Sequence, residues 1–239
     1  MGVVRRLEAS ELAARIDHTN LNPDATVRDI ERLCAEARDH GFRAVVVNPI
    51  WVPHAVKFLK GMEIRVCATI NVPMGGSTTL AKVVEIRNLR AMGCDEVDFM
   101  VNVGYLKSGM LEEFRRDVEE QVRAAEGMVT KAILETAVLT EQEVVLGARL
   151  CEEAGVDYVK NSTGWGKGGP ATVEIIRLLR SSVSPRVRVK ASGGIRDAAT
   201  ALALIEAGAD LIGTSRGVEI VKGLASMTAE RNASSARPK

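Results

Sequence analysis

The sequence lacks the cysteine and histidine patterns that mark metal sites and disulfide frameworks. Its four cysteines lie far apart and form no CxxC pair, and it contains only three scattered histidines. Widely spaced cysteines of this kind are typical of reduced, intracellular thiols. We therefore expect no disulfide framework, no zinc site and no other metal cluster.

An excess of charge of one sign and long apolar runs are missing as well. The chain has 32 basic and 31 acidic residues, a net charge of +1, which gives no electrostatic reason to expect nucleic acid or an anionic membrane as a partner. No apolar run could span a bilayer, and the N-terminus MGVVRRLEAS has no apolar core of signal-peptide length. The sequence predicts a cytoplasmic protein.

What the sequence does contain is a repeated strand–helix pattern over its 239 residues. Gly41, Gly93, Gly155 and Gly208 each follow a helical segment and precede an apolar strand, as glycines that end helices do. Each interval encloses one further strand, so the unit is about 26–31 residues, the size of a βα unit. The eight predicted strands are residues 15–20, 43–48, 64–71, 95–102, 130–136, 156–161, 186–191 and 209–214.

Amphipathic helices are predicted between these strands. Residues 26–40 carry apolar side chains at helical spacing, Thr140 and Glu143 form a capping-box pattern, and Asp197 and Gly208 bracket another helix. Alternation of eight strands with helices predicts a single (β/α)8 TIM barrel over residues 1–239. From about residue 225 we expect a tail that begins as a short helix and fades into disorder. The alternative is an open doubly wound sheet, but no GxGxxG motif of a dinucleotide site follows the first strand.

Alternation along the strands separates inward-facing from outward-facing side chains. In EVDFMVN the apolar residues at positions 97, 99 and 101 form the outward face, so Asp98 faces inward. The same reasoning on the next three strands gives an interior charged set: Asp98, Lys131, Glu135, Lys160, Arg188 and Lys190. Buried charges are costly unless they are paired or used in function.

Two interpretations divide this set. Lys131, Glu135 and Arg188 fit an interior ion-pair network that only fills the barrel. Asp98, Lys160 and Lys190 lie nearer the C-terminal ends of their strands, where barrel active sites are found.

Lys160 and Lys190, on neighbouring strands, can supply amine chemistry. A lysine attacks a carbonyl only as the free amine, which is scarce at pH 7 when the pKa is ~10.4. Burial of Lys160 and the nearby Lys190 ammonium would both lower the pKa of Lys160, and Asp98 could carry protons. This grouping is what a Schiff-base lyase needs.

Glycine-rich loops after the seventh and eighth strands suggest an anion site. Gly193 and Gly194 stand just before a predicted helix, and GTSRG supplies Gly213, Ser215 and Arg216. Backbone N–H groups and a helix dipole attract anions there, and these loops form the usual phosphate site of barrels. The alternative is that the glycines serve only as turn residues.

Motifs along nearly the whole chain resemble those of the deoxyribose-phosphate aldolases, a class I aldolase family, in the same order: IDHTNLNPDAT, VVVNPIWVP, EVDFMVNVG, KAILET, VKNSTGWG and VKASGGIR. The resemblance implies reversible cleavage of 2-deoxy-D-ribose 5-phosphate to acetaldehyde and D-glyceraldehyde 3-phosphate through a lysine Schiff base, without a cofactor. We also expect a homo-oligomer, either a dimer or a tetramer, with a small phosphosugar as its substrate.

The resemblance also implies roles for individual residues. Lys160 matches the Schiff-base lysine, Lys190 the lysine that perturbs it, and Asp98 the proton-relay aspartate. The residues that would hold the phosphate are Gly164, Gly193, Gly194 and Ser215. The chain departs from the family at Asn161, where threonine is usual, and at Trp165, where phenylalanine or a phosphate-contacting lysine is common.

Two other functions are compatible with the same residues. One is another Schiff-base barrel, such as a fructose-bisphosphate-type aldolase or a transaldolase, with a different donor pocket. The other is a phosphosugar-binding barrel without enzymatic activity, in which the interior charges only stabilise the fold.

Overall fold

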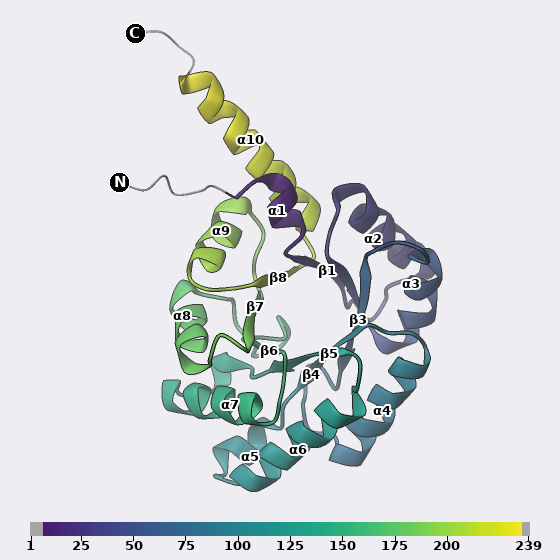
Figure 1. Cartoon of the computed structure of the whole chain (residues 1–239), viewed down its shortest axis with the longest axis vertical. Coiled ribbons are helices and arrows are strands. Elements are labelled where there is room, and N and C mark those ends of the chain that lie inside the picture. Colours follow the sequence, from purple (N-terminus) through teal and green to yellow (C-terminus); the bar gives the residue numbers. More distant parts are fainter. Residues whose placement is uncertain (1–6, 236–239) are drawn as a thin grey trace.

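Eight parallel strands form a closed barrel in the order β1 to β8. A computed structural model describes residues 7–235, and in Figure 1 the strands form the inner ring of the molecule. All eight predicted strands are present, with ends shifted by at most three residues, so the prediction of a TIM barrel is confirmed. Their bounds are β1 (Ile16–Asn20), β2 (Ala44–Val47), β3 (Arg65–Ile70), β4 (Glu96–Met100), β5 (Val129–Ile133), β6 (Tyr158–Lys160), β7 (Arg188–Ser192) and β8 (Leu211–Thr214).

Helices lie outside this ring (Figure 1). Those between strands are α2 (Val27–His40), α3 (Val52–Phe58), α4 (Thr79–Ala91), α5 (Val103–Lys107), α6 (Leu111–Ala124), α7 (Glu141–Glu153), α8 (Val173–Ser182) and α9 (Ala198–Glu206). The short helix α1 (Ala9–Ala13) precedes β1, and α10 (Gly217–Ser235) follows β8. Two 3₁₀ turns, η1 (Pro49–Trp51) and η2 (Thr136–Val138), follow β2 and β5.

Local sequence signals explain where these helices begin and end. The Thr140 hydroxyl accepts from the Glu143 N–H, and the Glu143 carboxylate accepts from the Thr140 N–H, which is the predicted capping box. Gly41 ends α2 with φ of 68°, a left-handed conformation that glycine adopts without steric cost. The Asp197 carboxylate caps α9 by accepting from the Thr200 N–H.

The C-terminal segment contains the helix expected after about residue 224. Helix α10 continues to Ser235, and the rest of the tail expected to be disordered, residues 236–239, lies outside the described part of the chain. Residues 225–235 contain no glycine or proline, and Leu224 and Met227 pack toward the core, so nothing ends the helix at 225. Figure 1 shows α10 beside α1, extending away from the barrel.

The two faces of the barrel wall differ as the alternation predicts. Val97 and Phe99 of β4 belong to the apolar core outside the ring, and both are fully buried. Between them, Asp98 is also fully buried but belongs to a polar interior. No helix within residues 7–235 is long and apolar enough to cross a membrane.

Candidate active site

The structure brings together the three residues that sequence analysis placed at the centre of the chemistry. Lys160 on β6 and Lys190 on β7 are partners in the strand register. Oδ2 of Asp98, on β4, accepts from Lys160 Nζ at 2.8 Å and from Lys190 Nζ at 2.7 Å. All three are buried, with exposed fractions of 4%, 1% and 0% for Lys160, Lys190 and Asp98. One carboxylate oxygen therefore joins two ammonium groups.

The two lysines have opposite pKa shifts. Burial lowers the pKa of Lys160, and the Lys190 ammonium lowers it further, against the opposing pull of Asp98. Burial acts on Lys190 in the same direction, but Asp17 and Asp98 outweigh it and raise the pKa of Lys190. Lys160 is therefore the member of the pair that loses its proton more readily, as a nucleophilic amine must.

Asp98 remains an ionised carboxylate in this environment. Burial alone would raise its pKa, but Lys131, Lys160 and Lys190 outweigh burial and hold the pKa of Asp98 well below its usual range. An ionised carboxylate can accept a proton from an adjacent ammonium or water and return it.

Lys131 lies in the interior below this group and forms the expected ion-pair network. Its Nζ is 2.6 Å from Oε2 of Glu96 and 2.9 Å from Oδ1 of Asp98. Arg43 completes the network by pairing with Glu96 and, at 2.9 Å, with Asp17. Opposite charges alternate through these contacts, so each buried charge has a partner.

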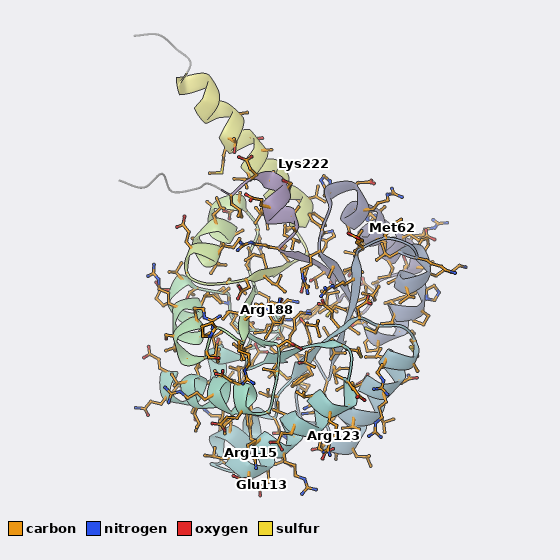
Figure 2. All side chains as sticks on the ribbon, in the orientation of Figure 1. Met62, Glu113, Arg115, Arg123, Arg188 and Lys222 are labelled. Carbon is orange, nitrogen blue, oxygen red and sulfur yellow. The ribbon has the colours of Figure 1, made fainter. Side chains whose placement is uncertain are left out.

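Two predictions about the interior set are wrong. Glu135 does not face into the barrel, because β5 ends at Ile133 and Glu135 has left the strand conformation with φ of 56°; its carboxylate instead binds Thr163. Arg188 does lie on the inner face, between the outward-facing Val187 and Val189, but it is exposed at the start of β7 and its guanidinium stacks 4.2 Å from the centre of the Tyr158 ring instead of joining the ion-pair network. Figure 2 shows Arg188 within the ring of helices, whereas the labelled Arg115 and Arg123 lie on the outer helix α6.

Sequence reasoning missed two interior residues that contact the site. Asp17, on β1, accepts from Lys190 Nζ at 2.6 Å. Cys67, on β3, donates its S–H to Oδ1 of Asp98 at 3.1 Å. Both would have been found by applying the same alternation to the first and third strands, since Ile16 and Ala68 are the outward-facing neighbours.

A pocket of about 440 Å³ opens above Lys160 at the C-terminal ends of the strands, a size typical of small-molecule sites. Its lining includes Lys160 but neither Lys190 nor Asp98, which lie beneath it. The predicted phosphate residues Gly164, Gly193, Gly194, Gly213 and Ser215 all line it. The pocket is also lined by Arg196 and Arg216 but, among the described residues, by no carboxylate. Its charge therefore suits an anionic ligand.

The helix that follows Gly193 and Gly194 begins where the predicted bracket of Asp197 and Gly208 places it. Helix α9 starts at Ala198, and the Asp197 carboxylate already caps it, so its N-terminus is not free for a ligand. Helix α10 starts at Gly217, directly after Ser215 and Arg216, and so presents its N-terminus beside the pocket.

The glycines of the β7–α9 loop are also needed for packing. Gly193 and Gly194 have φ of 99° and 73°. A Cβ atom on Gly193 would lie 2.6 Å from the carbonyl oxygen of Gly169, and one on Gly194 would lie 3.2 Å from Cβ of Pro170. These two positions therefore let the loop pack against the loop that follows β6.

The two departures from the family pattern occupy different places. Asn161 is buried and does not line the pocket; its side chain bonds to the backbone of Ser192 in both directions, at 3.0 and 2.8 Å. Trp165 does line the pocket and is 40% exposed. Of the two, only Trp165 is placed to contact a ligand. Within residues 7–235, no group of three His, Cys, Asp or Glu side chains could hold a metal ion.

Comparison with known proteins agrees with this geometry. The model of the DeoC/LacD family of aldolases matches residues 12–227. The chain belongs to this family. It is 53% identical over 208 residues to a deoxyribose-phosphate aldolase of Brevibacillus brevis, covering 87% of this chain and 94% of the relative. It is 45% identical over 214 residues to one of Dictyoglomus turgidum, covering 90% and 97%.

Solved structures of aldolases share the fold closely. The deoxyribose-phosphate aldolase of Aeropyrum pernix, described as a unique tetramer, superposes with a TM-score of 0.86 at 33% identity, covering 92% of this chain and 93% of that one. An aldolase named QR15 gives 0.87 at 35% identity, covering 92% and 98%. The protein is thus an aldolase, a carbon–carbon lyase of the deoxyribose-phosphate aldolase family.

Proposed function

We propose that the protein cleaves 2-deoxy-D-ribose 5-phosphate reversibly to acetaldehyde and D-glyceraldehyde 3-phosphate through a Schiff base on Lys160. The single observation that carries this proposal is the buried trio, in which Asp98 accepts from both lysines and only Lys160 has a lowered pKa and reaches the pocket. The names of the relatives support the same substrate.

The chemistry follows from these placements. The free amine of Lys160 attacks the substrate carbonyl at C1, and the resulting carbinolamine loses water to form a protonated imine, which withdraws electrons from the bond between C2 and C3. A base removes the proton of the substrate's 3-hydroxyl as that bond breaks, and glyceraldehyde 3-phosphate leaves. The enamine then takes a proton at carbon, and water releases acetaldehyde. Asp98, ionised and in contact with both ammoniums, is placed to carry these protons directly or through water.

The phosphate end of the substrate is assigned to the part of the pocket formed by the glycine-rich loops. Gly164, Gly193, Gly194, Gly213 and Ser215 line this region, and Arg196 and Arg216 line the same pocket. The start of α10 beside Ser215 adds further backbone N–H groups. Together they favour a dianion over a neutral sugar.

The deciding experiment is borohydride trapping with acetaldehyde, with the adduct located by peptide mass. We expect one reduced two-carbon adduct on Lys160, and release of glyceraldehyde 3-phosphate from 2-deoxyribose 5-phosphate in a coupled assay. An adduct on Lys131 or Lys167 with Lys160 unmodified would refute the assignment. Reaction with dihydroxyacetone phosphate as donor instead of acetaldehyde would identify another Schiff-base aldolase, and absence of any reducible imine would favour a binding protein.

We also infer a homo-oligomer and a cytoplasmic location. The tetrameric description of the Aeropyrum pernix relative supports assembly, as do large apolar side chains exposed on the surface, among them Ile50, Met74 and Leu80 at 72%, 82% and 72%. All four cysteines are buried and unpaired, as a reducing compartment allows. Light scattering after size-exclusion chromatography will give the mass of the particle, and a monomer would refute the first inference.

A further inference from the structure

Glu135 is a buried carboxylate that forms no ion pair. It is 5% exposed, and no basic side chain of the described residues lies within ion-pair distance of it. Its partners are both on Thr163: the N–H donates to Oε1 at 3.0 Å and the hydroxyl donates to Oε2 at 2.5 Å. A buried carboxylate needs such donors, so its burial depends on the position of Thr163.

Thr163 belongs to the loop of residues 162–169, which follows the lysine strand β6. Its hydroxyl oxygen also accepts from the N–H of Trp165 at 3.1 Å. Ser162 fastens the other end of the loop by donating to the carbonyl oxygens of Gly168 and Gly169 at 2.7 and 3.0 Å. Thr163, Gly164 and Trp165 line the pocket, so Glu135 bonds directly to the backbone of a pocket-forming loop.

The 162–169 loop packs tightly around the Glu135 carboxylate. A Cβ atom on Gly168 would lie 2.6 Å from Oε1 of Glu135 and 2.6 Å from Oγ of Ser162, so only glycine fits there without displacement. Glu135 itself has φ of 56° and ψ of 56°, an unfavourable conformation for a residue with a side chain. Strained non-glycine residues of this kind cluster at functional sites.

We propose that Glu135 is a positioning residue that fixes the 162–169 loop at the phosphate end of the pocket, and thereby sets the preference for phosphorylated substrates. The proposal rests on the function proposed above, because it requires an anion to bind in this pocket. Glu135 acts through Thr163 and does not touch the lysine pair: it shares no contact with Lys160, Lys190 or Asp98.

The test uses the full-length chain with Glu135→Ala, Glu135→Gln and Gly168→Ala, the last of which disturbs the same contact with Glu135 intact. Thr130→Val is the matched control: it removes a hydrogen bond to Asp157 near the opposite end of β5. We expect Glu135→Ala and Gly168→Ala to raise KM for 2-deoxyribose 5-phosphate at least tenfold. The value of kcat/KM for unphosphorylated 2-deoxyribose and acetaldehyde trapping should change less than twofold. Glu135→Gln, which keeps an acceptor for the Thr163 N–H, should fall between wild type and Glu135→Ala.

Calorimetric titration with inorganic phosphate separates this inference from the proposed reaction. Glu135→Ala should bind phosphate about tenfold more weakly than wild type, with Thr130→Val unchanged. Unchanged phosphate binding by Glu135→Ala would overturn the inference, because Glu135 would then have no effect on the phosphate site. Tighter binding would also overturn it, because the carboxylate would then only repel the anion. Equal losses on both sugars would likewise overturn it and make Glu135 a purely structural residue. A wild-type protein that cleaves no 2-deoxyribose 5-phosphate, but whose phosphate affinity falls in Glu135→Ala, would refute the proposed reaction alone.

Discussion

Lys160 and Lys190 carry the same functional group at paired positions of adjacent strands, yet their pKa values move in opposite directions. The difference lies in their carboxylate partners. Lys190 contacts two carboxylates, Asp17 and Asp98, whereas Lys160 contacts Asp98 alone. Under the proposed function, the number of neighbouring acids decides which amine acts as the nucleophile and which keeps its positive charge.

The role of Lys190 can be measured by replacing it with a neutral side chain of similar length. In Lys190→Met, Lys160 loses a repelling ammonium, and Asp98 loses one of the cations that compete for it, so the pKa of Lys160 should rise. The pH profile of acetaldehyde trapping should move to higher pH, and each unit reduces the free amine at neutral pH about tenfold, or ~1.4 kcal/mol.

Arg188→Met serves as the control, because it removes an exposed cation from the start of the same strand. Its trapping profile should match wild type. An unmoved profile in a folded Lys190→Met variant would leave burial as the cause of activation and assign Lys190 to proton transfer or structure.

For single residues, the sequence predicts which side chains face the barrel interior wherever strand alternation holds. Asp98, Lys160 and Lys190 could be placed together in advance because each lies within a regular strand between apolar neighbours. Glu135 could not be placed, because the chain leaves β5 two residues earlier and a left-handed residue breaks the alternation. The contact of Glu135 with Thr163 joins residues 28 apart, and no local pattern encodes such a contact.

Among elements, the loops at the C-terminal ends of the strands are held by close backbone contacts. The loop between β3 and α4 contains adjacent glycines in different settings. A Cβ atom on Gly75, where φ is 69°, would lie 2.5 Å from the carbonyl oxygen of Val101, whereas the nearest atom to one on Gly76 is 4.0 Å away. Gly75 thus packs this loop directly against the end of β4.

Substitutions at Gly75 and at its neighbour Gly76 give a prediction and its control. Gly75→Ala should lower the free energy of unfolding by about 2 kcal/mol or more, because the substitution combines an unfavourable φ with a backbone clash. Gly76→Ala should change it by no more than about 0.5 kcal/mol. Urea unfolding followed by circular dichroism measures both, and equal effects of the two substitutions would contradict the assigned contact.

Element boundaries were predictable where a capping motif marks them, as at Thr140 and Asp197. They were not predictable where packing decides. No capping motif marks the end of the chain, where helix α10 runs to Ser235 and Leu224 and Met227 pack toward the core. The predicted phosphate residues line one pocket, and the helix that begins next to Ser215 is α10; their binding of an anion stays a prediction.

For the whole molecule, the buried acids predict how stability depends on pH. The carboxyl group of Asp17 is fully buried, and although burial alone would raise its pKa, Lys190, Lys131 and Arg43 lower it to about 2 from an ordinary value of 3.8. Since the folded pKa is depressed, Asp17 stabilises the fold fully above about pH 4 and loses this contribution as pH falls toward 2. The difference corresponds to about 2–3 kcal/mol.

Unfolding free energies measured between pH 7 and pH 2.5 will test this. We expect the wild-type value to fall steeply below pH 4, and the fall to be shallower in Asp17→Asn, which lacks the titrating group. Asp24→Asn, at an exposed position, is the control and should keep the wild-type slope. A slope in Asp17→Asn as steep as that of wild type would mean that other acids dominate acid unfolding.

The paired charges inside the barrel also restrict how this sequence can evolve. Glu96 and Lys131 are fully buried and 2.6 Å apart. Losing either one removes the nearest counter-charge of the other, which keeps only Arg43 and Arg65 (for Glu96) or Asp98 and Asp17 (for Lys131), at a cost of up to about 3–5 kcal/mol. A Glu96→Gln, Lys131→Met double variant should cost at least 1 kcal/mol less than the sum of the two single variants in urea unfolding. Additive costs would show that the two positions are independent. If the two positions are coupled, neither can change alone. A descendant that neutralises one charge then survives only in a background where the partner residue has already changed. The order of mutations, as well as their number, therefore limits which sequences can replace this charged interior.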